Sequence, residues 1–197
     1  MLKARIAVLV SGGGTNLQAI IDSQKAGNLP SGEIALVIAD KAGVKAIERA
    51  GNANIPCEVI VRKEEGFEEK VLAALSAHSI DMVVLAGFLG ILSADFIGRF
   101  QGPIINIHPA LIPSFCGKGM YGLRVHQAAL DYGVKVTGAT VHFVNEVPDG
   151  GKIIAQKAVD ILPEDTAETL QRRVMEQAEW KLLPAAAEMV AKEIISR

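Results

Sequence analysis

The stretch with the clearest chemical potential is I-I-N-I-H-P-A, residues 104–110, in which two polar side chains interrupt a run of isoleucines. Isoleucine is β-branched and favours a buried strand, and side chains two positions apart on a strand point to the same face. Asn106 and His108 therefore emerge side by side, and Pro109 has no N–H with which to extend a sheet ladder. The pattern predicts a polar pair at the end of a strand.

This pair has the parts needed for acyl-group transfer. The amide of Asn106 can donate to an oxygen that becomes negative during reaction, and His108 can carry a proton at neutral pH. Ser114 and Cys116 lie nearby in the chain but form no recognisable nucleophile motif, so direct attack by a substrate amine is favoured. The alternative is a histidine that only caps a loop carbonyl at a strand end.

A carboxylate for His108 is available in V-P-D-G-G, residues 147–151. Beside His108, Asp149 would raise the pKa of the imidazole and hold the ring in place, as a proton donor at neutral pH requires. Otherwise Asp149 only forms the turn that the two glycines favour. His142 and His78 are interpreted as structural, and His126 stays ambiguous.

A glycine-rich segment, S-G-G-G-T-N at residues 11–16, follows an apolar strand and precedes a helical pattern. Glycines let a backbone approach an anion, and free N–H groups at a helix start favour phosphate. The segment matches neither common nucleotide-loop motif, so a single monophosphate fits best. The alternative is a tight turn in which Thr15 or Asn16 caps the helix.

Short Val- and Ile-rich runs alternate with helical patterns in the first half, which is typical of β-α-β units with a parallel sheet. We expect an α/β fold: a Rossmann-like, mostly parallel twisted sheet with flanking helices and an antiparallel extension in the C-terminal half. The expected strands are 6–10, 34–39, 58–61, 82–86, 104–108, 135–144 and 152–158. The expected helices are 16–25, 44–50, 66–78, 94–100, 123–132 and a long final helix over 166–195.

Length and composition narrow the class of protein. The 197 residues suit one domain, residues 1–197, whose two halves share one sheet: the glycine-rich phosphate-binding loop lies in the first (about 1–100) and the Asn106–His108 catalytic pair in the second (about 101–197). A net charge of −2 offers no broad basic surface for nucleic acid, and no apolar run is long enough to span a membrane. Two cysteines form no metal or disulfide pattern, so we expect a cytoplasmic protein.

Four segments together resemble the family of phosphoribosylglycinamide formyltransferases, the folate-dependent enzymes of purine synthesis. They are S-G-G-G-T-N-L-Q-A-I-I-D, L-A-G-F-L-G-I-L-S, N-I-H-P-A-L-I-P-S-F and H-F-V-N-E-V-P-D-G-G, and the resemblance runs along nearly the whole chain. It implies the formyltransferase fold and transfer of the formyl group of N10-formyltetrahydrofolate to the amine of glycinamide ribonucleotide. It also implies N10-formyltetrahydrofolate as cosubstrate, no metal, no nucleic-acid or membrane partner, and a monomer or homodimer.

The resemblance assigns roles residue by residue. Asn106 would polarise the formyl oxygen and line the folate pocket, His108 would be the proton donor, and Asp149 would support its charge and also contact folate. The other implied residues bind the ribonucleotide (Gly14, Thr15, Asn16 and, near its amine, Glu179) or folate (Leu89, Gly90, Ile91, Leu92, Asn145, Glu146, Val147, Pro148). Some relatives have arginine at the position of Gly90, where it would pair with the folate glutamate.

Three other functions stay open. In a formyltetrahydrofolate hydrolase, water replaces the amine, although relatives of that kind carry an extra amino-terminal domain. A methionyl-tRNA formyltransferase would need a further carboxy-terminal domain and an RNA-binding surface. A phosphosugar- or folate-binding module would bind its ligand without turnover.

Overall fold

The computed structural model describes residues 2–197. Its centre is a seven-stranded sheet in the order β3-β2-β1-β4-β5-β6-β7. The first five strands in this order are parallel, and β6 and β7 are added antiparallel at the β5 edge. The expected fold class, including the antiparallel extension, is confirmed.

The parallel half alternates strands with helices, since each parallel connection needs a crossover. In chain order its elements are β1 (Ala4–Val10), α1 (Thr15–Lys25), β2 (Gly32–Ala39), α2 (Lys45–Asn52), β3 (Cys57–Val59), α3 (Phe67–Ala77), β4 (Met82–Leu85), α4 (Ala94–Arg99) and β5 (Ile104–His108). The second half contains α5 (Leu123–Tyr132), β6 (Val136–Phe143), β7 (Ile153–Asp160), α6 (Ala167–Val174), the π-helical turn η1 (Met175–Glu179) and α7 (Trp180–Ile195).

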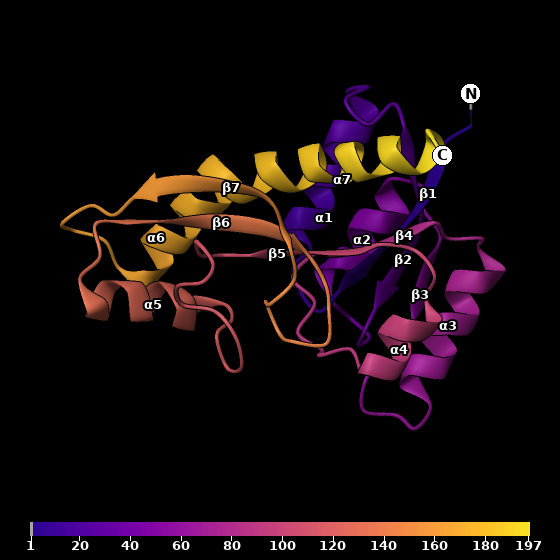
Figure 1. The fold of residues 1–197 in the computed structure, drawn as a ribbon, viewed down its shortest axis with the longest axis horizontal. Coiled ribbons are helices and arrows are strands. Elements are labelled where there is room, and N and C mark those ends of the chain that lie inside the picture. Colours follow the sequence, from indigo (N-terminus) through magenta and orange to yellow (C-terminus); the bar gives the residue numbers. More distant parts are fainter. Residues whose placement is uncertain (1) are drawn as a thin grey trace.

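Helices cover both faces of the sheet, so its central strands are apolar on both sides (Figure 1). Along β1, Ile6, Val8 and Val10 join an apolar cluster with side chains of α1, α2 and α7. Ala7 and Leu9 point the other way, into a second cluster with α3 and α4. The period of two explains why both clusters draw on the same strand.

The long final helix expected over residues 166–195 is interrupted. Its first two turns form α6, the chain then widens into the π-helix η1, and α7 completes the segment. Pro184 lies inside α7, where it cannot donate the usual backbone bond to the carbonyl of Trp180. Apolar spacing does not distinguish a π-helical turn from an α-helix, so the sequence pattern predicted one continuous helix.

No helix within residues 2–197 has both the length and the apolar character needed to cross a membrane.

Candidate active site

The carboxyl ends of the parallel strands and the turn between β6 and β7 border one pocket of about 530 Å³. Such a place is the usual ligand site of an open α/β sheet, because the loops that leave adjacent strands converge there. Among the predicted site residues, the pocket is lined by Asn16, Leu89, Gly90, Ile91, Leu92, Asn106, His108, Asn145, Glu146, Val147, Pro148, Asp149 and Glu179.

Asn106 and His108 lie at the end of β5, as their alternation with isoleucine predicted. In the antiparallel register, Asn106 faces His142 and His108 faces Thr140 of β6. Both side chains border the pocket, although His108 is almost completely buried. The strand therefore delivers an amide and an imidazole to the same wall.

The His108 ring is fixed by a hydrogen bond at Nε2 and faces a carboxylate with Nδ1. Nε2 lies 2.9 Å from the carbonyl oxygen of Phe115 and donates to it, while Nδ1 lies 3.5 Å from Oδ2 of Asp149. Burial lowers the pKa of His108, and the charge of Asp149 opposes this effect without reversing it. Asp149 raises the pKa of His108, as expected, but desolvation outweighs the carboxylate and the net direction is down. Burial therefore favours the neutral form of His108.

Asp149 lies in the turn after β6 with a left-handed backbone, at φ 56°. Its Oδ2 accepts a hydrogen bond of 2.8 Å from the backbone N–H of Gly117. Burial raises its pKa, but the neighbouring imidazoles of His142 and His108 and the bond from Gly117 together bring the pKa below its ordinary value. Asp149 is thus an ionised carboxylate directed at His108.

His142 is a site residue that the sequence reasoning interpreted as structural. Its Nδ1 donates to the carbonyl of Phe143, so Nε2 is free to accept from Nδ2 of Asn106 at 3.1 Å. The same Nε2 lies 3.5 Å from Oδ1 of Asp149. The signal that could have found His142 is the antiparallel pairing of its strand with β5, which places it opposite Asn106.

The side of the pocket that is predicted to bind the ribonucleotide joins residues far apart in the chain. Nδ2 of Asn16 donates to Oε2 of Glu179 at 2.6 Å, across 163 residues of sequence. Glu179 is buried, and burial raises its pKa despite the bond from Asn16. The π-helical turn η1 ends at Glu179 and so places this carboxyl group beside the start of α1.

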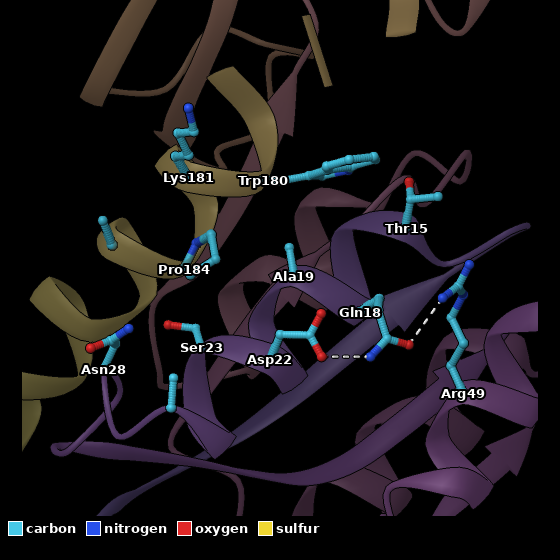
Figure 2. Close-up of a pocket in the computed structure, with 12 residues that line it drawn as sticks. Thr15, Gln18, Ala19, Asp22, Ser23, Asn28, Arg49, Trp180, Lys181 and Pro184 are labelled. Atoms are coloured by element: carbon cyan, nitrogen blue, oxygen red, sulfur yellow. Dashed lines mark hydrogen bonds between the residues drawn. The ribbon is translucent and has the colours of Figure 1, made fainter. Parts of the chain in front are cut away.

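Two predicted phosphate-site residues lie outside the pocket lining. Gly14 has a left-handed backbone at φ 69°, and a Cβ there would lie 2.8 Å from Cβ of Ala46 on α2. Thr15 instead borders a second hollow of about 660 Å³ between α1 and α7, where Figure 2 shows it between Trp180 and Arg49. Their backbone N–H groups belong to the start of α1, whereas Gly12 and Gly13 border the main pocket directly.

The predicted folate segments present apolar surface around the same pocket. Three large hydrophobic side chains are exposed there: Leu89, Ile91 and Val147. Exposed apolar side chains around a pocket are typical of a site that binds an apolar ligand. Gly90 packs closely against the ring of Phe88. A Cβ at Gly90 would lie only 2.6 Å from that ring, so there is no room for a larger side chain such as arginine unless the ring moves.

Within residues 2–197, no three or more His, Cys, Asp or Glu side chains are grouped so that they could hold a metal ion.

Comparison with known proteins finds that the chain is similar to formyl transferases. The model of the formyl transferase family (Formyl transferase) matches residues 4–187. The chain is 42% identical to the phosphoribosylglycinamide formyltransferase of Haemophilus influenzae over 184 residues, which covers 91% of this chain and 84% of that protein. It is 47% identical over 193 residues to the human trifunctional purine biosynthetic protein adenosine-3, covering 96% of this chain but only 18% of that protein.

Solved structures agree with these relatives. The phosphoribosylglycinamide formyltransferase of Bacillus halodurans superposes with a TM-score of 0.86 and 42% identity, covering 96% of each chain. Glycinamide ribonucleotide transformylase 1 of Symbiobacterium toebii superposes with a TM-score of 0.89 and 38% identity, covering 97% of this chain and 89% of that one.

Proposed function

Because this chain belongs to the formyl transferase family, we propose that it transfers a formyl group from N10-formyltetrahydrofolate to the amine of glycinamide ribonucleotide, in de novo purine biosynthesis. The chain spans only 18% of the length of the human trifunctional relative, so the proposal covers this one step and none of that protein's other activities. The carrying observation is the convergence of Asn106, His108 and Asp149 with the glycine-rich loop on one pocket. A monomer or homodimer in the cytoplasm stays a prediction.

The ribonucleotide and the folate have separate ends of this pocket. The phosphate binds at residues 12–16, where glycines and the first N–H groups of α1 favour an anion. The glycinamide amine lies near Glu179, whose carboxyl group accepts hydrogen bonds from it. The folate packs on the exposed apolar side chains of Leu89–Leu92 and Asn145–Asp149.

The reaction begins when the amine nitrogen attacks the formyl carbon. A C–N bond forms, and the carbonyl electron pair moves to the oxygen, which becomes an oxyanion. Both amide hydrogens of Asn106 are directed at protein acceptors, His142 Nε2 at 3.1 Å and Asp149 Oδ1 at 3.5 Å. The formyl oxygen replaces the longer contact, so that Asn106 stabilises the oxyanion as it develops.

Collapse of the tetrahedral intermediate breaks the bond between the formyl carbon and N10. The attacking nitrogen must lose one proton and N10 must gain one, so a group that accepts and returns a proton suffices. Neutral His108 has its lone pair on Nδ1, because Nε2–H is donated to Phe115. It takes the proton at Nδ1 and returns it to N10, and the ionised Asp149 stabilises the transient imidazolium.

The test is the release of tetrahydrofolate with and without glycinamide ribonucleotide. Release that depends on the amine, with one formylated ribonucleotide formed per tetrahydrofolate, is the expected result. Equal release with and without the amine, accompanied by free formate, identifies a hydrolase. Tight binding of both ligands without turnover identifies a binding module.

A further inference from the structure

Three adjacent parallel strands end at a polar cluster that the proposed reaction does not use. Ser11 follows β1, Asp40 follows β2, and Leu89 lies in the loop after β4. These strands are neighbours in the order β2-β1-β4, so their carboxyl ends meet. Ser11 begins the phosphate-binding loop, and Leu89 begins the apolar folate segment.

One hydroxyl group connects these loops. Oγ of Ser11 donates to Oδ2 of Asp40 at 2.8 Å and accepts from the backbone N–H of Leu89 at 2.9 Å. A serine hydroxyl has a single hydrogen, so donating it to Asp40 turns a lone pair toward Leu89. Ser11 and Asp40 are both buried, with exposed fractions of 2% and 4%. The two bonds therefore form a protected link between the loops.

Asp40 is fixed independently of any ligand. Its backbone N–H donates to the carbonyl of Val10, and its carbonyl accepts from the N–H of Arg62. The guanidinium Nε of Arg62 lies 3.6 Å from Oδ2 of Asp40. Asp40 is not among the residues that line the pocket, so it acts on the ligands through its neighbours, and of these Ser11 is bonded to the loop of Leu89.

We propose that Asp40 is a positioning residue that, through the Ser11 hydroxyl, couples the ribonucleotide loop to the folate loop, so that each ligand tightens binding of the other. The proposal rests on the function proposed above. Both loops contain glycine, including Gly87 with φ 70°, and glycine loses more conformational freedom than any other residue when a loop is fixed in one conformation. A ligand that orders one loop holds the Ser11 acceptor still and reduces the cost of ordering the other.

The test measures the Kd of tetrahydrofolate, which has no formyl group to transfer, with and without saturating glycinamide ribonucleotide. For the wild type we expect the ribonucleotide to tighten tetrahydrofolate binding by about fivefold or more. In Ser11→Ala and Asp40→Ala, this factor falls to within about twofold of one, as the oriented acceptor for Leu89 is lost. Asp40→Asn keeps an oxygen that can accept from Ser11, so it retains most of the coupling.

Ser76→Ala, at an exposed position on α3, is the matched control and should keep the wild-type factor. In steady-state kinetics, Ser11→Ala and Asp40→Ala raise both KM values more than they lower kcat. Circular dichroism verifies the fold of each variant. If Ser11→Ala does not fold, the result for Asp40→Ala decides the question. A wild-type factor within twofold of one overturns the coupling, as does full coupling in a folded Ser11→Ala protein.

Failure of the proposed function is distinguishable from failure of this coupling. A wild type that transfers formyl groups but shows no coupling overturns the inference alone. A wild type that fails to transfer them overturns the function, and inorganic phosphate then replaces the ribonucleotide as the ligand of residues 12–16. Tighter tetrahydrofolate binding in phosphate, lost in Ser11→Ala, still supports the link, and no change in Kd contradicts it.

Discussion

The proposed role of Asn106 depends on a single atom, the amide nitrogen Nδ2 that donates to the oxyanion. Removing one preorganised donor of this kind typically costs ~10²–10³ in kcat. We expect Asn106→Ala to lose about that factor in kcat while its KM values change little, as measured in the formyl-transfer assay. A loss of less than tenfold in a folded variant would make Asn106 a structural partner of His142.

Glu179 is the second residue with a role that can be separated by substitution. Glu179→Gln can keep the bond from Asn16 through its amide oxygen but removes the negative charge. A hydrogen bond to a charged group contributes about 1.5–3 kcal/mol, so we expect KM for glycinamide ribonucleotide to rise about 10- to 100-fold while KM for folate stays unchanged.

The pH dependence of the same KM gives an internal check. Since burial raises the pKa of Glu179, its carboxylate forms only at a higher pH than usual. KM for the ribonucleotide should therefore fall as pH rises through that pKa in the wild type and should lose this dependence in Glu179→Gln. Equal effects on the two KM values would place Glu179 in the fold and not in the ribonucleotide site.

At the scale of elements, the glycine-rich loop combines two different demands. Gly13 borders the pocket, and a Cβ there would meet no heavy atom within 4 Å. Gly13→Ala should therefore fold normally but place a methyl group at the anion's approach, raising KM for the ribonucleotide far more than KM for folate.

Gly14→Ala should have the opposite signature. Its positive φ and the contact of 2.8 Å with Ala46 predict a loss of ~1–3 kcal/mol in the free energy of unfolding, measured by denaturant titration. Gly51→Ala, at an exposed position in α2 with open space around it, is the matched control. A normal KM for the ribonucleotide in Gly13→Ala would remove the loop from the phosphate site.

Element positions were predictable wherever local chemistry decides them. The strand ending at His108 was predicted with its observed bounds, because β-branched residues and then Pro109 define it locally. The π-helical turn η1 was not predictable, since it changes the backbone bonding without changing the apolar period. The turn nevertheless matters for the site, because it sets the position at which Glu179 contacts Asn16.

At the scale of the whole molecule, the site depends on strands that meet only in the folded sheet. The two-residue spacing along one strand predicted that Asn106 and His108 lie together. The turn sequence V-P-D-G-G suggested Asp149 as the carboxylate partner. The inclusion of His142 required the pairing of β6 with β5, and the Ser11–Asp40 link required the order β2-β1-β4. Contacts between distant strands carry no local pattern, so these residues emerged only from the structure.

The pair of His108 and Asp149 is the clearest product of that assembly, since the sheet brings a strand end and a turn together across 40 intervening positions. NMR titration of the His108 imidazole in the wild type and in Asp149→Asn tests it directly. Asp22→Asn, at an exposed position on α1, is the control.

We expect the wild-type pKa of His108 to lie below its ordinary value of about 6.5 and to fall further in Asp149→Asn, because the carboxylate favours the charged ring and its loss leaves burial unopposed. The limb of the pH profile of kcat/KM that reports His108 should move to lower pH by the same amount. An identical imidazole pKa in the wild type and Asp149→Asn would contradict the pair as the proton-transfer unit.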